Sequence, residues 1–325
     1  MRLSRRAMLA MTAATALAGR VQAQEPTQDV PPADRELRVP VRGGEIYVRI
    51  NGDLNAHKAP LLLVHGGPGG ACWQLFPALP LAADRAIIVY DQLDSGRSDA
   101  PNDPANWTVE RYASEIEAVR AALGIEQFHL LGHSWGGILA TRYAADHQDR
   151  LRSLILQGTP LSSRQWEESV SNLLDRMPDD QADVIREAER TGVMSEAYGQ
   201  AVTAFFRAHI NRTRSPAYAP AYMRDVPEGR GDALANAAVG MSVTRMTGFL
   251  DGFNDEPLLD GIATPTLLLN GELDVITPET TRALLPRLRA GTFVELAGAG
   301  HMAQFDRPDD WRETIDRFIA GADPA

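Results

Sequence analysis

Three residues far apart in the sequence have the types and the order of a nucleophile, an acid and a base. Ser134 lies in Gly132-His-Ser-Trp-Gly136, Asp274 ends Gly271-Glu-Leu-Asp274, and His301 ends Gly298-Ala-Gly-His301. A serine hydroxyl is a weak nucleophile, and it needs a base that is itself oriented by an acid. We therefore expect Ser134, His301 and Asp274 to catalyse acyl transfer in these three roles.

The residues around Ser134 predict a sharp turn between a strand and a helix. The apolar run 128–131 leads into the turn, and the helix-forming run 138–145 follows it. Glycines at 132 and 136 lack the Cβ atoms that would clash in so tight a turn. In this context Gly-x-Ser-x-Gly predicts a nucleophile elbow, which lifts the serine hydroxyl clear of the sheet.

Two neighbouring residues are weaker candidates for the same roles. Glu272 could serve as the acid, but it lies earlier in its turn than Asp274. His133 adjoins the nucleophile, but the elbow holds it, and we expect it to make a structural hydrogen bond. The sequence has no His-Glu-x-x-His and no Cys-x-x-Cys pattern, so we expect neither a metal nor a cofactor.

A glycine-rich turn, His65-Gly-Gly-Pro-Gly-Gly70, follows the apolar run 60–64. A tetrahedral intermediate needs hydrogen-bond donors for its oxyanion. The backbone N–H of Trp135 is one expected donor, and the turn supplies the other, with Gly67 favoured and Gly66 as the alternative. The turn lacks the Gly-Lys-Ser/Thr of a phosphate-binding loop.

Apolar runs alternate with helical segments and predict a mostly parallel sheet with helices on both faces. The expected strands are 36–41, 45–50, 60–64, 85–90, 128–131, 151–156, 264–269 and 292–296, and the expected helices are 108–123, 278–288 and 309–320. The three candidates follow strand ends, where open α/β sheets place their sites. Their chain order is that of the α/β-hydrolase fold.

The alternation stops between residues 162 and 257, which are charged, helix-prone and without a clear strand. We predict that this segment is a helical cap inserted between two late strands. The α/β-hydrolase core would then comprise residues 35–161 and 258–325.

The first 23 residues have the features of an export signal. Basic residues precede a short apolar region, and Val21-Gln-Ala23 offers a cleavage site. Ser4-Arg5-Arg6 resembles the start of a twin-arginine signal, with a Sec signal or an uncleaved anchor as alternatives. Residues 24–34 are polar and proline-containing, which predicts a linker. We expect a periplasmic or secreted protein with no membrane partner after cleavage.

The charge of the chain excludes some partners. The formal net charge is −11, and cleavage after Ala23 would remove four arginines and no acid, leaving −15. So acidic a protein is not expected to bind nucleic acid or an anionic membrane.

The sole cysteine, Cys72, cannot form an internal disulfide.

Several motifs together resemble those of the proline iminopeptidases, from about Glu36 to Ile319. They are His65–Gly70, Asp91–Ser98, Gly132–Gly137, Gly271–Asp274, Thr277-Pro278 and Gly300-His301. The resemblance implies an α/β hydrolase that removes N-terminal residues, often proline, from a small-molecule or short-peptide substrate. It also implies Ser134 as nucleophile, Asp274 as acid, His301 as base, and Gly67 with Trp135 as oxyanion donors.

Two positions depart from that family. Asp94 stands where the family usually has glycine, so the local loop is expected to differ. Val243 stands where a cap glutamate binds the α-amine of the substrate, and a valine cannot neutralise an ammonium. Asp251 and Asp255 are the candidates nearest in sequence to replace that carboxylate.

Three functions therefore stay open: an aminopeptidase, an esterase or amidase acting on uncharged acyl groups, and a non-catalytic binding module. The complete set of candidate catalytic residues argues against the third function.

Overall fold

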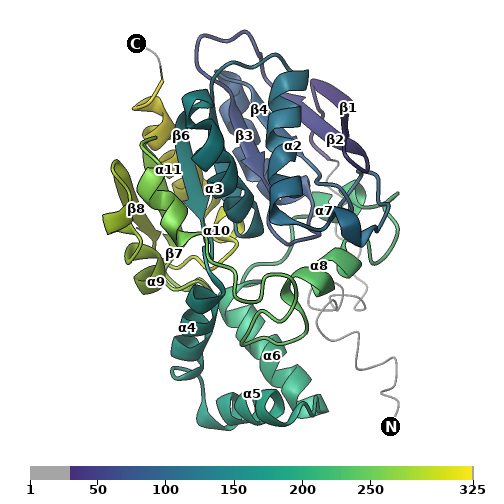
Figure 1. Ribbon diagram of the computed structural model, residues 1–325, viewed down its shortest axis with the longest axis vertical. Coiled ribbons are helices and arrows are strands. Elements are labelled where there is room, and N and C mark those ends of the chain that lie inside the picture. Colours follow the sequence, from purple (N-terminus) through teal and green to yellow (C-terminus); the bar gives the residue numbers. More distant parts are fainter. Residues whose placement is uncertain (1–29, 324–325) are drawn as a thin grey trace.

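An eight-stranded sheet forms the centre of the computed structural model, which describes residues 30–323 (Figure 1). Its order is β1-β2-β4-β3-β5-β6-β7-β8. Only β2 runs antiparallel to its neighbours, and all the other neighbouring pairs are parallel. The strands are β1 Arg35–Val41, β2 Gly44–Asn51, β3 Leu61–Val64, β4 Ile87–Tyr90, β5 Phe128–His133, β6 Leu151–Gln157, β7 Thr266–Gly271 and β8 Gly291–Leu296.

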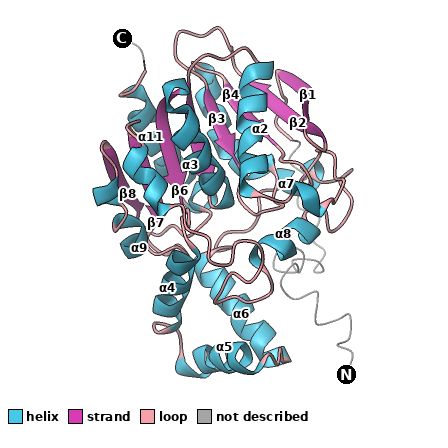
Figure 2. Cartoon of the chain, in the orientation of Figure 1, coloured by secondary structure: helices cyan, strands magenta, loops and turns pink. Residues whose placement is uncertain are grey.

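Helices cover both faces of this sheet, which confirms the predicted α/β-hydrolase fold class (Figure 2). They include α2 Val109–Ala122, α3 Trp135–His147, α9 Pro278–Arg282, α10 Ala303–Asp306, α11 Pro308–Ala320 and the 3₁₀ helix η1 Cys72–Ala83. Alternate strand residues pack on opposite sides. Leu62 and Val64 join the hydrophobic cluster under α2 and α3, whereas Leu61 and Leu63 join the cluster under η1 and α11.

The helix expected over residues 278–288 is shorter than predicted. Helix α9 ends at Arg282, and a 3₁₀ turn, Leu285–Arg287, replaces its second half. Pro286 explains the difference, because it has no N–H to donate to the carbonyl of Arg282 and its ring clashes with that carbonyl. The helical pattern of apolar residues therefore extends further along the sequence than the α-helix itself.

Five α-helices lie between β6 and β7, in the segment of residues 162–257 that we call the helical insertion. They are α4 Ser163–Leu174, α5 Asp179–Thr191, α6 Glu196–His209, α7 Tyr218–Tyr222 and α8 Asp232–Val239. Helices α4, α5 and α6 project beyond the end of the sheet (Figure 1). They enclose a hydrophobic cluster of their own that includes Val170, Ile185 and Phe205 and extends to Val275 and Ile276 after β7. The boundaries of a separate cap domain stay a prediction.

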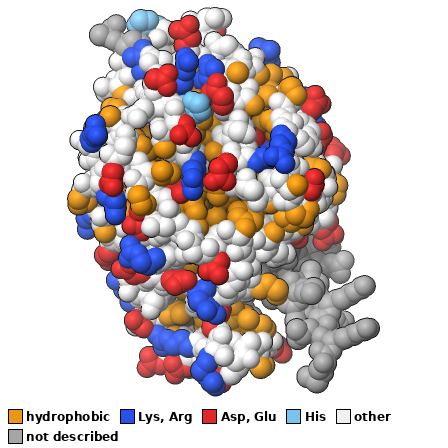
Figure 3. Space-filling model, viewed as in Figure 1, with side chains coloured by type: hydrophobic (Ala, Val, Ile, Leu, Met, Phe, Trp, Pro, Cys, Tyr) orange, Lys and Arg blue, Asp and Glu red, His pale blue; other side chains and the backbone are white. Residues whose placement is uncertain are grey.

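The surface drawn in Figure 3 carries basic and acidic side chains interspersed, with hydrophobic side chains gathered over its middle. This face therefore has no large patch of one sign. No helix within residues 30–323 is both long and apolar enough to cross a membrane. The predicted export signal and residues 24–29 of the linker lie outside the described residues.

Candidate active site

Ser134 lies on the predicted sharp turn, between β5 and α3. Its backbone has φ 55° and ψ −120°, in a region that L-residues rarely adopt. A Cβ atom on Gly132 would lie 2.3 Å from the Gly136 carbonyl oxygen, and one on Gly136 would lie 2.2 Å from that of Val64. The two glycines are therefore required for the turn, as the sequence motif predicts.

Asp274 and His301 lie together, although 27 residues separate them in the sequence. His301 Nδ1 is 2.8 Å from Asp274 Oδ1, which also accepts a hydrogen bond from the backbone N–H of Ile276 at 2.9 Å. Both side chains are buried. This contact holds the proton of the imidazole on Nδ1 and leaves Nε2 free to act as a base.

Glu272 and His133, the two weaker candidates, make structural contacts instead. Glu272 is exposed and accepts a hydrogen bond from the N–H of Gly298 at 2.8 Å. His133 Nε2 lies 3.0 Å from the backbone oxygen of His301, and a carbonyl can only accept, so Nε2 carries the hydrogen. Burial lowers the pKa of His133 well below its ordinary value, and the nearby His301 adds to this effect.

Gly158, which the sequence reasoning missed, lies against the Asp274–His301 pair just after β6. Its φ is +52°, and a Cβ atom there would lie 2.7 Å from Asp274 Oδ2 and 2.9 Å from His301 Nδ1. The absence of a side chain at 158 therefore makes room for the pair. The available signal was a glycine two residues after the predicted strand 151–156.

The glycine-rich turn after β3 lies beside the elbow. A Cβ atom on Gly66 would lie 3.1 Å from Ser134 Cβ and 2.8 Å from His133 Nδ1. Gly67 has φ +138°, which favours glycine. Within residues 30–323, the backbone N–H groups of Gly67 and Trp135 donate no hydrogen bond, so both are available to an oxyanion.

Gln92 connects this turn to the residue after the nucleophile. Its side-chain N–H donates to the His65 carbonyl at 2.9 Å, and its side-chain oxygen accepts from the Trp135 indole at 2.8 Å. Its backbone N–H donates to His65 Nε2 at 3.2 Å, so His65 Nδ1 carries the ring hydrogen and donates to the Gly66 carbonyl at 2.8 Å. Burial lowers the pKa of His65, which favours this neutral ring. Because the Gly66 carbonyl and the Gly67 N–H share one peptide plane, the bond orients that N–H.

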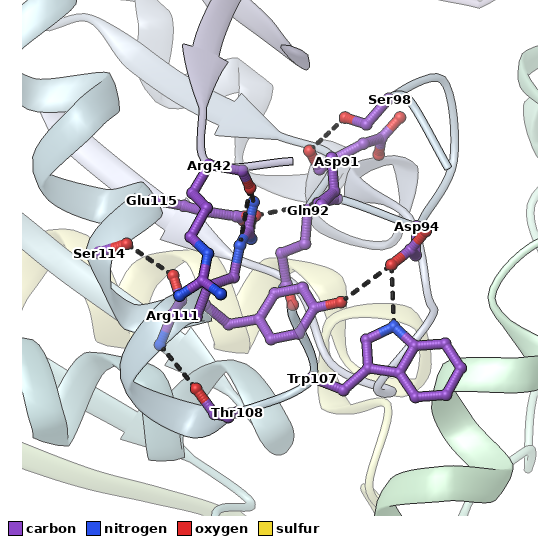
Figure 4. A network of polar contacts seen from close by, with 12 residues as sticks. Arg42, Asp91, Gln92, Asp94, Ser98, Trp107, Thr108, Arg111, Ser114 and Glu115 are labelled. Atoms are coloured by element: carbon purple, nitrogen blue, oxygen red, sulfur yellow. Dashed lines mark hydrogen bonds and ion pairs between the residues drawn. The ribbon is translucent and has the colours of Figure 1, made fainter. Parts of the chain in front are cut away.

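Asp94 keeps the backbone conformation that glycine favours, with φ 61°. Its carboxylate accepts a hydrogen bond from the Trp107 indole at 2.9 Å (Figure 4). It also accepts one from the Asn102 backbone at 2.8 Å, and the Tyr112 hydroxyl lies at 3.4 Å. These contacts offset the cost of a side chain at positive φ. The departure at 94 therefore adds anchors to the loop that contains Gln92.

Of the three candidates for substrate binding in the insertion, Val243 has no carboxylate and the carboxylate of Asp255 is already paired. Val243 is buried in the hydrophobic cluster of the insertion. Asp255 is buried and paired with Arg142, at 2.5 Å and 2.6 Å for its two oxygens. Asp251 is exposed.

Glu189, which the sequence reasoning also missed, lies at the turn that contains Val243. It accepts hydrogen bonds from the backbone N–H of Val243 at 3.0 Å and from the Ser242 hydroxyl at 2.6 Å. The Tyr198 hydroxyl donates to it at 3.3 Å. The carboxylate thus holds the turn, and no spacing in the sequence connects position 189 with position 243.

A hydrogen-bonded Ser–His–Asp chain, separate from the candidate catalytic residues, lies at the opposite ends of β5 and β6. His129 Nδ1 is 2.8 Å from Ser153 Oγ, and His129 Nε2 is 3.0 Å from Asp323 Oδ1. Burial lowers the pKa of His129 to about 4. Ser153 and His129 are fully buried, so a substrate cannot reach them, and Asp323 is also bound by Arg85 at 2.7 Å. This chain is structural.

Among residues 30–323, no three His, Cys, Asp or Glu side chains are grouped as metal ligands.

Comparisons with known proteins agree with this fold. Residues 59–308 match the alpha/beta hydrolase fold family. A proline iminopeptidase of Heyndrickxia coagulans is 32% identical over 286 residues, which cover 86% of this chain and 97% of that protein. The crystal structure of a Mycobacterium smegmatis proline iminopeptidase has a TM-score of 0.80 at 29% identity, covering 89% of this chain and 98% of that one. The structure of VinJ has a TM-score of 0.81 at 26% identity, covering 90% and 100%. The protein is therefore a hydrolase, and its chain belongs to the proline iminopeptidase family of α/β hydrolases.

Proposed function

We propose that this protein hydrolyses an amide or ester bond of a small or short-peptide substrate through an acyl-enzyme on Ser134. Two observations together support the proposal: the strained elbow of Ser134 and the buried Asp274–His301 pair. His133, which adjoins Ser134, connects them, because its ring bonds to the His301 carbonyl at 3.0 Å. His301 Nε2 takes the hydroxyl proton as the serine oxygen attacks the carbonyl carbon. The leaving amine or alcohol receives that proton, and a water molecule activated by His301 then releases the acid.

The oxyanion of each tetrahedral intermediate is assigned to the N–H groups of Trp135 and Gly67, with Gly66 as the alternative to Gly67. Both favoured donors are free of other acceptors within the described residues. Donors fixed before the reaction stabilise the developing charge without reorganisation.

Substitution and labelling test the assignment. Ser134→Ala should lower kcat by several orders of magnitude with folding intact, and Asp274→Asn should lower it strongly. A serine-directed phosphonate should label Ser134 and no other residue, as read by mass spectrometry of the labelled peptide. Ser153→Ala is the matched control, because Ser153 belongs to the buried Ser153–His129–Asp323 chain. This variant should retain activity. Substantial activity in Ser134→Ala would refute the mechanism.

A second candidate function is the hydrolysis of uncharged acyl substrates rather than of peptides with a free amine. It is supported by Val243 and by the ion pair that occupies Asp255. It is also supported by Phe249 of the insertion, which is 37% exposed and packs edge-on against Trp135 at 6.2 Å between ring centroids. An apolar side chain of the insertion therefore lies against the residue that follows the nucleophile, and a desolvated ammonium in such surroundings would need a carboxylate partner.

Matched substrates decide between these two functions. A Pro-arylamide and an N-acylated or simple acyl ester of similar size should show no large advantage for the free amine. An advantage of about a hundredfold in kcat/KM, roughly 2.7 kcal/mol of transition-state binding, would contradict this second candidate. Substitution of Asp251, Asp255 and Glu189 would then locate the carboxylate, by raising KM for the amine substrate alone.

We also propose that the protein is exported by the twin-arginine route and works in the periplasm or outside the cell. The support is the basic, then apolar, then small-residue pattern of residues 1–23. Changing Arg5 and Arg6 to Lys should trap the precursor in the cytoplasm, and the mature protein should begin at Gln24. Unchanged accumulation outside the cytoplasm would indicate the Sec route.

A further inference from the structure

The C-terminal end of α6 lies against both loops that carry the acid and the base. The backbone N–H of His301 donates to the carbonyl of His209, the last residue of α6, at 2.9 Å. The imidazole of His209 lies 2.9 Å from the carbonyl of Leu273, through Nδ1. Because a carbonyl can only accept, Nδ1 carries the hydrogen. One residue of the helical insertion thus bonds to the neighbour of Asp274 and to His301 itself.

The residues after His209 hold the same loop. Asp306 accepts hydrogen bonds from the Gly300 N–H at 2.8 Å and from the Thr213 hydroxyl. A Cβ atom on Gly300 would lie 2.8 Å from the His209 carbonyl oxygen and 2.5 Å from Arg212 Cδ. Glycine at 300 therefore permits the close approach of the insertion. Segment 209–213 packs tightly against the loop that carries His301.

These contacts constrain His301 from two sides. Its backbone N–H is bound by His209, and its carbonyl is bound by His133. Its imidazole is then held by Asp274. The contact of His209 with Leu273 is the remaining link, because it ties the loop of the acid to the helix that already holds the loop of the base.

We propose that His209 is a positioning residue, through which the helical insertion holds Asp274 and His301 in register with each other. The inference rests on the proposed function, because it assigns His209 an effect on the acyl-transfer step. His209 is itself outside hydrogen-bond reach of any reacting atom: its two contacts are to backbone groups. It therefore acts on kcat through loop geometry rather than on substrate affinity.

Two substitutions separate the donor of His209 from its ring. His209→Asn keeps a side-chain N–H near the position of Nδ1 but removes the ring. His209→Phe keeps an aromatic ring, which lies 5.0 Å from Phe205 between centroids, but removes the donor. Thr203→Ala is the matched control, because Thr203 is an exposed residue of the same helix whose hydroxyl bonds within the helix, to Gly199 at 2.7 Å.

Three measurements on the full-length protein distinguish the outcomes: kcat and KM on a chromogenic ester, the rate of phosphonate labelling of Ser134, and the melting temperature. His209→Phe should lower kcat and the labelling rate about tenfold, which equals about 1.4 kcal/mol, with KM within about twofold. His209→Asn should recover most of both rates, and Thr203→Ala should match the wild type.

Other results would overturn the inference. Wild-type rates in a folded His209→Phe protein, or loss in His209→Asn with retention in His209→Phe, would show that His209 only packs. If His209→Phe does not fold, a slow His209→Asn protein with a normal melting temperature would also contradict the inference. Absence of labelling in the wild type would instead refute the proposed function, so the two failures are distinguishable.

Discussion

Replacing Gly158 with alanine should break the Asp274–His301 contact without changing either residue. A methyl group at 158 would lie 2.7 Å from Asp274 Oδ2 and 2.9 Å from His301 Nδ1, whereas ordinary contacts begin near 3.4 Å. The carboxylate must therefore retreat by about 0.7 Å, since close-packed interiors do not absorb such an overlap. The present contact is 2.8 Å, so this retreat would bring it to the limit of a hydrogen bond.

The expected loss can be bounded. A misplacement of about 1 Å can cost about a hundredfold in rate, and loss of the orienting acid in a serine triad costs about 10⁴-fold. We expect Gly158→Ala to lower kcat/KM by a factor between about a hundred and about 10⁴. The labelling of Ser134 should slow in parallel. The left-handed backbone at φ +52° adds an instability of about 1–2 kcal/mol.

Gly192 provides the matched control for that backbone cost. It has φ +72° and no atom within 4 Å of a Cβ built on it. Gly192→Ala should therefore lose about 1–2 kcal/mol of stability and keep its activity. Activity of Gly158→Ala within threefold of wild type, or an equal loss in Gly192→Ala, would refute the reasoning.

Three further predictions concern stability, each read from thermal or denaturant unfolding. Asp94→Gly keeps the backbone conformation but leaves the Trp107 indole unpaired, so the free energy of unfolding should fall by about 1–3 kcal/mol. Asp94→Asn should recover most of this loss. An unchanged stability in Asp94→Gly would contradict the role of the carboxylate. Burial raises the pKa of Glu115 from 4.5 to about 7, although Arg111 opposes this shift. The folded state then binds more protons between these pH values, so wild-type stability relative to Glu115→Gln should fall as pH rises from 4.5 to 7, and a difference that stays constant with pH would be evidence against it. Asp323→Ala removes the carboxylate that binds the buried guanidinium of Arg85 at 2.7 Å and leaves it only the more distant carboxylate of Asp84, at 3.7 Å. The loss of stability should therefore reach at most about 3–5 kcal/mol with kcat unchanged, whereas a loss of activity without a loss of stability would oppose a structural role.

The candidate catalytic residues were predictable from the sequence because their constraints are local or follow from strand direction. The turn at Ser134 needs glycines at fixed positions on either side, and a reader of the sequence can see them. Asp274 and His301 each follow a strand, and parallel strands bring their carboxyl ends to one edge of the sheet. The pairing of these two residues at 2.8 Å is what that rule leads one to expect.

The supporting contacts were not predictable, because they join segments that have no fixed relation along the chain. His209 reaches Leu273 across 64 residues, and Gln92 reaches Trp135 across 43. Gly158 has the conformation of an ordinary turn glycine, and only its neighbours show why a methyl group cannot be placed there. Such contacts depend on how the insertion and the loops pack together.

The carboxylates available to a substrate also depend partly on the sequence and partly on the tertiary structure. The sequence by itself determined that position 243 lacks a carboxylate, since that is a matter of residue type. Only the tertiary structure decided that Asp255 is already neutralised by Arg142 and that Glu189 is bound to the turn of residues 242 and 243. A carboxylate is available to a ligand only if the fold has brought no other hydrogen-bond donor to it. Those donors come from segments that are distant in the sequence, so residue types alone do not identify them.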